Sequence, residues 1–251
     1  MLRPQHCTKE AAFYMARQFE ELDYRATPIG ALSLRRRHEP RIAKDVFEIK
    51  LGDEFLMSSI ITDSEVALAR SGVAACDGDQ LDVAVGGLGL GYTAKAVLDE
   101  PRVRSLLVID FLEAVINWHE TGLLPLGPAL TADSRCTLAH GDFFALAAAD
   151  TGFDQTQSSR RFHAILVDID HSPNALLDPR SDSFYTPQSF ARVANQLHPH
   201  GIFGLWSDDN PDPAIVERLA TAFTDAWAEP VTLDVPMREK PFTQTVYLAR
   251  K

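Results

Sequence analysis

The sequence contains few cysteines, and none lies at the spacing of a metal-binding pair. Its 251 residues include three, Cys7, Cys76 and Cys136, which are scattered and odd in number. Disulfide frameworks and structural zinc sites need cysteines paired at short, regular spacings. Their absence argues against both and favours a reducing compartment, so we expect a cytoplasmic protein.

Long apolar segments are absent too. No run approaches the roughly 18 apolar residues of a membrane-spanning helix, and the start, MLRPQHCTKE, has no apolar core of a signal peptide. The sequence also has no internal repeat and no low-complexity tract. We therefore expect a soluble protein with no membrane partner.

Positive charge is in short supply. The chain has 24 Lys and Arg against 35 Asp and Glu, a formal net charge of −11. Nucleic-acid-binding surfaces are normally basic, so this balance argues against a nucleic-acid partner. It is compatible with a cationic small molecule, although acidic surface that keeps a protein soluble explains it as well.

The composition that is present is ordinary for a globular protein, with 45% hydrophobic and 24% charged residues. This length accommodates one large domain with a small appendage. The patterns predict a helix over residues 9–22, then strands over residues 31–36, 45–51 and 54–58 with a hairpin turn at Gly52-Asp53. We expect residues 1–60 to form the appendage and residues 61–251 an α/β domain.

The basic run from Arg35 to His38 falls on the first of these strands. Charged side chains on an edge strand block unwanted pairing with other chains. We interpret the run as the exposed face of an edge strand, with an anion contact as the alternative.

A glycine-rich turn between two apolar runs organises the rest of the chain. Leu81–Val85 has the length of a buried parallel strand, and a helical pattern then leads to a second strand that ends at Asp110. This is a βαβ unit. Glycines at its turn, among them Gly87, Gly89 and Gly91, allow a ligand to approach the main chain beside the unpaired amides of a helix start.

Asp110 is placed to accept hydrogen bonds from the two hydroxyls of a ribose. Tyr92 stands where a dinucleotide-binding GxGxxG turn has its third glycine. This favours a nucleoside without a pyrophosphate, such as S-adenosylmethionine, over NAD. A tight turn without a ligand is the alternative.

A third strand over residues 136–139 is followed by Asp142. An acid at this strand end is positioned to reach an adenine amino group, but Asp142 also suits the N-cap of the next helix. With the glycine turn and Asp110 in place, we favour contact with the ligand.

The fourth strand, Phe162–Val167, is followed by Asp168, Asp170 and His171. Open parallel sheets carry their chemistry outside the carboxyl ends of the strands, so these three are candidate catalytic residues. Later patterns predict helices from residue 187 and over 213–227, and strands over 202–207, 231–235 and 245–249, the last inserted antiparallel. His198 and His200 should lie at the far edge of the sheet, and with no third ligand nearby we expect no metal site.

This order of elements resembles the class I S-adenosylmethionine-dependent transferase fold, and more closely the spermidine synthase (polyamine aminopropyltransferase) family. The residues that carry the resemblance, over residues ~25 to 250, are FLMSS, SEVALA, VAVGGLGLGYTAKAV, VIDFLEAVINWH, HGDFF and AILVDIDHSP. It implies a Rossmann-like sheet on which Gly87, Gly89 and Gly91 line the methionine or aminopropyl arm. It also implies that Asp110 holds the ribose and Asp142 the adenine, with a homodimer in solution.

The sequence departs from this family on the amine side. The family carries D-S-[ST]-D after the fourth strand, and here Asp168 keeps the first position while His171 takes the fourth. The family's tyrosine–histidine–glutamate element is reduced to Ser64-Glu65, and the glutamine usual after the second hairpin has no counterpart. Asp170 is a candidate replacement for the missing second carboxylate.

Three functions follow as hypotheses. The first is transfer of an aminopropyl group from decarboxylated S-adenosylmethionine to an amine, leaving methylthioadenosine, with Asp168 as the base and Asp170 or His171 assisting. The second is methyl transfer from S-adenosylmethionine itself. The third is a nucleoside-binding or assembly protein that has lost its acceptor site.

Overall fold

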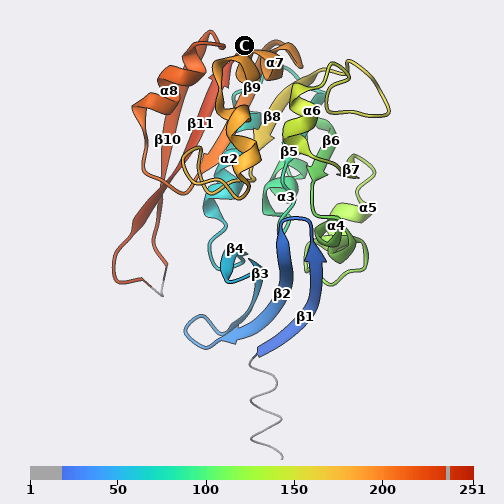
Figure 1. Ribbon diagram of the computed structural model, residues 1–251, viewed down its shortest axis with the longest axis vertical. Coiled ribbons are helices and arrows are strands. Elements are labelled where there is room, and N and C mark those ends of the chain that lie inside the picture. Colours follow the sequence, from blue (N-terminus) through green and yellow to red (C-terminus); the bar gives the residue numbers. More distant parts are fainter. Residues whose placement is uncertain (1–18, 236–237) are drawn as a thin grey trace, which may run out of the picture. The chain divides into compact units, whose positions relative to one another are not determined.

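The computed structural model describes residues 19–235 and 238–251 (Figure 1). The chain forms two compact units. The first comprises Met1–Ile60 with Val235–Glu239, and the second comprises Ile61–Asp234 with Lys240–Lys251.

The first unit contains a four-stranded antiparallel sheet in the order β1-β2-β3-β4. Its strands are β1 (Phe19–Thr27), β2 (Gly30–Glu39), β3 (Lys44–Leu51) and β4 (Glu54–Ser58). The predicted turn between β3 and β4 is confirmed, with Gly52 at a φ of 58°. The predicted helix over residues 9–22 lies mostly outside the described residues, and its last part was wrong because residues 19–22 belong to β1.

The arginine run lies on a central strand, so its interpretation as an edge strand was wrong. β2 pairs with β1 on one side and with β3 on the other. Arg36 binds Glu20 on β1 at 2.5 Å, and Arg37 binds Glu48 on β3 at 2.8 Å. Opposite charges that face each other across strands stabilise their pairing, so these ion pairs link β2 to both of its neighbours.

The second unit contains a seven-stranded sheet in the order β10-β11-β9-β8-β5-β6-β7. The pairs among β9, β8, β5, β6 and β7 are parallel, and β11 lies antiparallel between β9 and β10 as predicted. This confirms the α/β, Rossmann-like class. The elements are α2 (Asp63–Ala74), β5 (Leu81–Gly86), α3 (Tyr92–Leu98), β6 (Val103–Asp110), α4 (Glu113–Glu120), α5 (Gly127–Ala132), β7 (Cys136–His140), α6 (Phe143–Ala148), β8 (Phe162–Val167), the 3₁₀ helix η1 (Pro179–Tyr185), α7 (Pro187–Asn195), β9 (Leu197–Ser207), α8 (Pro213–Ala220), β10 (Asp225–Leu233) and β11 (Phe242–Arg250).

Two elements differ from the sequence-based expectation. The helix expected over residues 213–227 ends at Ala220, and Trp227 lies near the start of β10. β10 pairs along its whole length with β11, and this pairing overrides the helical pattern of the sequence. Gly127–Ala132 form the short helix α5, which the sequence patterns did not predict.

Helices cover both faces of this sheet. On one face, α2 packs so closely that a Cβ on Gly72 would lie 2.5 Å from the Leu166 side chain of β8. On the other face, α6, α7 and α8 contribute Phe143, Phe190 and Leu219 to a buried hydrophobic cluster. Because both faces are buried, the strands are almost continuously apolar, and polar side chains are left for the strand ends.

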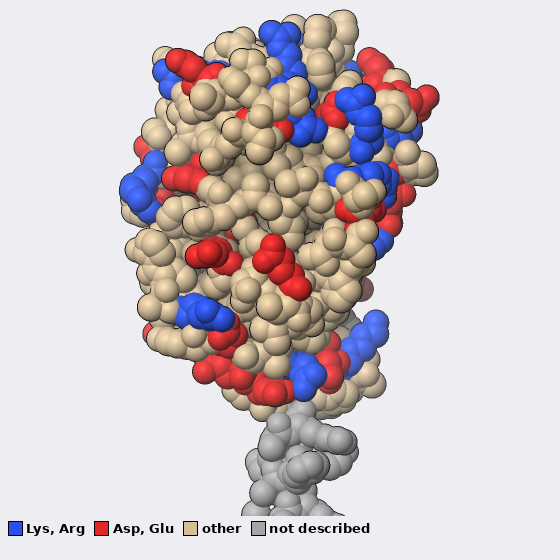
Figure 2. Space-filling model, turned by 90° about the vertical axis from the view of Figure 1, so that its right-hand side faces the viewer, with Lys and Arg blue, Asp and Glu red and all other residues tan. Residues whose placement is uncertain are grey.

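Charged side chains are dispersed on the face shown in Figure 2, where small basic and acidic groups alternate around uncharged surface. Such a surface does not carry the continuous basic stripe of a nucleic-acid-binding face. Within residues 19–235 and 238–251, no helix is long and apolar enough to span a membrane.

Candidate active site

The predicted site residues follow the carboxyl ends of neighbouring strands in the seven-stranded sheet. Beyond the strand ends, the amide of Gly87 binds the Ile109 carbonyl at 2.9 Å, and the amide of Asp168 binds the Gly86 carbonyl at 2.8 Å. The amide of Gly141 binds the Asp110 carbonyl at 3.0 Å. β5 pairs with β6 on one side and with β8 on the other, so the strand order changes direction at β5. The carboxyl ends of these strands therefore form a topological switch point, where open α/β sheets bind ligands.

The turn after β5 requires its glycines. Gly87, Gly89 and Gly91 have φ values of 92°, 47° and 92°, which side chains with a Cβ rarely adopt. A Cβ on Gly87 would lie 2.0 Å from the backbone oxygen of Asp168, and one on Gly91 would lie 2.8 Å from His119 Cε1. The turn is therefore packed against the end of β8 on one side and against α4 on the other.

Asp110 is bound to this turn. Its carboxylate accepts hydrogen bonds from the amides of Leu88 at 2.8 Å and Leu112 at 2.7 Å, and the amide of Gly89 also donates to it. Burial raises the pKa of Asp110, and these amides act in the opposite direction. A carboxylate has about four acceptor positions, so about one remains for a ribose hydroxyl, and the ribose role stays a prediction.

His119 is a residue of the site that the sequence-based interpretation did not single out. Its side chain is fully buried, and Nε2 lies 2.9 Å from the Gly89 carbonyl oxygen. A carbonyl only accepts, so Nε2 carries the proton, while burial lowers the pKa of His119 and keeps the ring neutral. His119 thus stabilises the glycine turn through its hydrogen bond to the Gly89 carbonyl. The available signal was a histidine beside Trp118 in a helix with an apolar face.

Asp142 serves as the N-cap of α6. Its carboxylate accepts a hydrogen bond from the amide of Ala145 at 3.1 Å, and the residue is exposed. The capping role left open by the sequence is therefore confirmed. One carboxylate oxygen holds the cap, so the adenine contact stays a prediction.

Asp168 belongs to a cluster of side chains from three elements. Thr93 Oγ1, at the start of α3, donates to Asp168 Oδ2 at 2.6 Å and lies 3.5 Å from the backbone oxygen of Glu65 in α2. Glu65 Oε2 accepts a hydrogen bond from Ser64 Oγ at 2.7 Å. Ser64, Glu65 and Thr93 are all buried. The Ser64-Glu65 pair noted in the sequence therefore lies beside the candidate base.

The two acids of this cluster influence each other. Burial, and then the charge of Asp168, raise the pKa of Glu65 to about 8. Burial raises the pKa of Asp168 to about 6, and the hydrogen bond from Thr93 acts in the opposite direction. At neutral pH the pair therefore holds about one proton, with Asp168 ionised and Glu65 protonated.

This raised pKa predicts a pH-dependent stability. Glu65 ionises near its ordinary value of 4.5 when unfolded and near 8 when folded, so the folded state holds a proton that the unfolded state releases. Stability is then lost as the pH rises from about 5 to about 8. The Glu65→Gln variant has no such proton. We expect its free energy of unfolding to fall by on the order of 3 kcal/mol less than that of the unmodified protein over this range, since one pKa unit is worth about 1.4 kcal/mol. Urea unfolding of both proteins at both pH values measures this, and equal losses would contradict it.

Asp170 lies on the same loop, but its carboxylate is engaged in hydrogen bonds within the protein. Its carboxylate accepts hydrogen bonds from the Leu177 amide at 2.8 Å, from Ser181 Oγ at 3.0 Å and from the Tyr185 hydroxyl at 2.8 Å. These bonds order the segment up to η1, and they leave Asp170 few acceptor positions. His171 is half-buried, and its carbonyl binds the Asp208 amide at 2.7 Å. A catalytic part for Asp170 or His171 stays a prediction.

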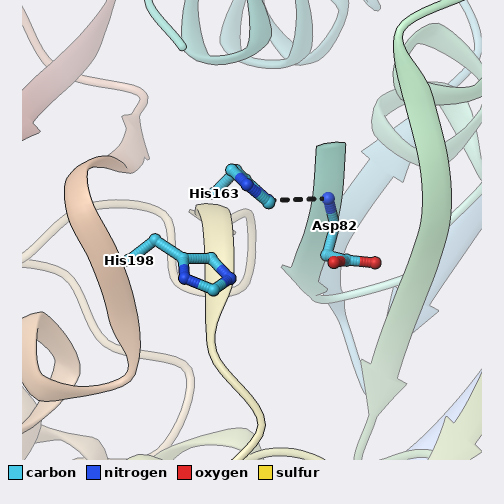
Figure 3. A group of neighbouring side chains, drawn as sticks. All are labelled: Asp82, His163 and His198. Carbon is cyan, nitrogen blue, oxygen red and sulfur yellow. Dashed lines mark hydrogen bonds between the residues drawn. The ribbon is translucent and has the colours of Figure 1, made fainter. Parts of the chain in front are cut away.

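A second group of candidate ligands, Asp82, His163 and His198, lies at the opposite end of these strands (Figure 3). The premise that no third ligand lies near His198 was therefore wrong. However, the Asp82 amide donates to His163 Nδ1 at 3.0 Å, so the ring proton is on Nε2 and neither nitrogen offers a free lone pair. The Asp82 carboxylate already binds Arg104 and Arg160. The arrangement favours a structural role over metal binding.

Solved structures share this fold. The chain is similar to the spermidine synthase of Thermotoga maritima, with a TM-score of 0.68 and 14% identity over 92% of this chain and 72% of that one. A spermidine synthase solved in complex with the transition state analogue AdoDATO has the same TM-score and identity, with 92% and 73% covered. No protein-family profile matches this sequence, and no curated protein does. The predicted resemblance is thus confirmed at the level of the fold, which is that of the spermidine synthases.

Proposed function

We propose that this chain is a spermidine synthase-like transferase, which binds decarboxylated S-adenosylmethionine and transfers its aminopropyl group to a small-molecule amine. One observation supports the proposal: the candidate base is in contact with the glycine turn, which is the candidate nucleoside site. Asp168 supplies the backbone oxygen against which Gly87 packs and the carboxylate that Thr93 binds. A nucleoside on the turn would therefore present its reactive carbon close to an acid.

The residues of the turn fit such a nucleoside. Asp110, which is bound to this turn, retains about one acceptor position for a ribose hydroxyl. Glu65 and Asp168 border the same turn through Thr93. The negative charge of Asp168 would repel the carboxylate of S-adenosylmethionine, which supports the decarboxylated form as the ligand.

The reaction requires a neutral amine, because a protonated nitrogen has no electron pair for attack. An alkylamine is largely protonated at pH 7, so a base must take one proton. Asp168, with a pKa of about 6, is ionised at that pH and is suited to take it. The amine nitrogen then bonds to the carbon next to the sulfonium, the carbon–sulfur bond breaks, and its electron pair leaves on the sulfur of methylthioadenosine.

Ligand binding discriminates this proposal from its alternatives. Thermal unfolding is measured with S-adenosylmethionine, its decarboxylated form and methylthioadenosine at equal concentrations. The proposal expects the largest increase in Tm with the decarboxylated form. A larger increase with S-adenosylmethionine supports methyl transfer instead, and no increase with any of the three supports an assembly protein.

Asp110 gives the matching mutational prediction. Replacing Asp110 with Ala removes the acceptor for the ribose and is expected to weaken methylthioadenosine binding at least about tenfold, since hydrogen bonds to charged groups are worth about 1.5–3 kcal/mol. Isothermal titration calorimetry measures the Kd. The control is Asp99→Ala, which removes an exposed acid paired with Lys95 at the other end of α3. Unchanged affinity in Asp110→Ala would refute the assignment of the ribose site.

A homodimer in the cytoplasm completes the proposal. Analytical ultracentrifugation of the full chain tests the homodimer, and a sedimenting monomer at micromolar concentration would remove that part.

A further inference from the structure

Two buried polar atoms without a hydrogen-bond partner lie on neighbouring strands near the carboxyl end of β9. They are Trp206 Nε1 on β9 and Gln244 Oε1 on β11, and neither has a partner within residues 19–235 and 238–251. One of these atoms is a donor and the other is an acceptor. A buried polar atom that stays unpaired costs stability, so a pair of them on one part of a sheet requires an explanation.

The orientation of the Gln244 amide is fixed by its neighbour. Gln244 is 5% exposed, and its Nε2 donates to Asp208 Oδ1 at 2.5 Å. A carboxylate only accepts hydrogen bonds, so the nitrogen of the amide must face Asp208. The Oε1 atom therefore points away from Asp208, and its lone pairs are free to accept.

The strand register places Trp206 beside the candidate base. Gly204 of β9 pairs with Leu166 of β8, and both face α2, since a Cβ on Gly204 would lie 2.7 Å from Leu166 and 3.0 Å from Leu68. Asp168 and Trp206 are two residues further along these strands, and the amide of Asp168 still binds β5 at 2.8 Å. Side chains alternate between faces along a strand, so Asp168 and Trp206 lie side by side on the α2 face.

Gln244 lies on the same face, on the other side of Trp206. Val246 of β11 pairs with Trp206, and Gln244 is two residues before Val246. Diagonal neighbours on one face of an antiparallel pair are within reach of each other's long side chains. Asp168, Trp206 and Gln244 therefore follow one another across the carboxyl end of β8, β9 and β11.

We propose that Trp206 and Gln244 select the acceptor, by binding a neutral amide group that it carries at the end opposite its reacting amine. The indole N–H donates to the amide oxygen, and Gln244 Oε1 accepts from the amide nitrogen. The acceptor then spans the face from β8 to β11, with its amine at Asp168. This inference rests on the proposed function and names the class of acceptor, an amino amide.

Charged groups match these two atoms less well. A second ammonium group has only donors, so it leaves the N–H of Trp206 unpaired. A carboxylate has only acceptors, so it leaves Gln244 Oε1 unpaired and facing another oxygen. An amide presents a donor and an acceptor together. Sites built around such groups discriminate strongly against a ligand that leaves them unpaired.

The test compares three amines that share a four-carbon chain: 4-aminobutanamide, 1,4-diaminobutane and 4-aminobutanoate. Isothermal titration calorimetry on the full chain, saturated with methylthioadenosine, gives the Kd of each. We expect 4-aminobutanamide to bind at least about tenfold more tightly than the other two, because it alone makes both hydrogen bonds. The inference is overturned if 4-aminobutanamide binds no more tightly than the diamine and the amino acid. This comparison uses only the unmodified protein, so it does not depend on the folding of a variant.

Two variants assign the preference to these side chains. Trp206→Phe removes the N–H and keeps an aromatic ring, and Gln244→Met removes the amide and keeps the length of the side chain. Each should raise the Kd of 4-aminobutanamide at least about threefold and leave that of 1,4-diaminobutane within about twofold. The control is Trp227→Phe, since Trp227 Nε1 on β10 already donates to Glu229 at 2.9 Å, and it should change none of the affinities.

The nucleoside separates the two levels of the argument. Unchanged affinity for 4-aminobutanamide in both Trp206→Phe and Gln244→Met, with methylthioadenosine bound, would overturn the role of these residues and leave the proposed function standing. Failure of methylthioadenosine to bind the unmodified protein would overturn the proposed function together with this inference.

Discussion

Replacing Asp168 with Asn is expected to lower kcat by about 10²- to 10⁴-fold, the usual contribution of a general base. Asn preserves the size of the side chain but does not take a proton from the amine. Methylthioadenosine affinity should stay within about twofold, because no part of the proposed nucleoside contact uses this carboxylate. Turnover is measured as methylthioadenosine released from decarboxylated S-adenosylmethionine with a series of diamines.

The pH profile separates this role from a structural one. With a pKa of about 6, Asp168 is protonated in acid, so activity of the unmodified protein should fall below about pH 6. The small residual activity of Asp168→Asn should lack this acidic limb. Asp178→Asn is the matched control, since Asp178 lies ten residues further on and binds Arg180 at the protein surface. Turnover in Asp168→Asn within a few-fold of normal would rule out the assigned base.

Gly87→Ala is expected to destabilise the protein by more than about 3 kcal/mol, the range reached when backbone strain and steric overlap combine. The added Cβ would lie 2.0 Å from the backbone oxygen of Asp168, and the φ of 92° is unfavourable for alanine. Relieving the overlap requires the turn to move away from the end of β8. Nucleoside binding and turnover should therefore be lost together. Urea unfolding measures the loss of stability, and calorimetry measures the loss of nucleoside binding.

A second glycine isolates the steric part of this effect. Gly78 also has a positive φ, of 77°, but a Cβ there has open space around it. Gly78→Ala should therefore cost only about 1–2 kcal/mol, the energy of a left-handed backbone. If both variants lost the same stability, the close contact between the glycine turn and Asp168 would not exist as described.

The sequence determined the positions of the chemistry along the chain. The apolar strand Leu81–Val85, the glycines and Asp110 predict a βαβ unit, and the structure confirms it as β5, α3 and β6. The position of Asp168 was predictable because it directly follows an apolar strand of a parallel sheet, at the carboxyl end where such sheets carry their ligand sites. Local patterns carry this information because strand and helix periodicities are set by neighbouring residues.

Contacts between distant segments were not predictable in the same way. Trp227 was expected in a helix and lies in a strand, since pairing with β11 outweighs the local pattern. Asp170 follows the same strand as Asp168, but its carboxylate turns to Ser181 and Tyr185 of η1. Sequence spacing alone did not distinguish the two acids.

The sequence by itself thus determined the fold class, the glycine turn and the candidate base. Only the tertiary structure decided which other groups share the site: it brought Glu65 of α2 and Thr93 of α3 to Asp168, and buried His119 behind Gly89. The physical reason is that the pKa and the partners of an acid depend on burial and on charges from other segments. Those are properties of the packed chain, which no local pattern records.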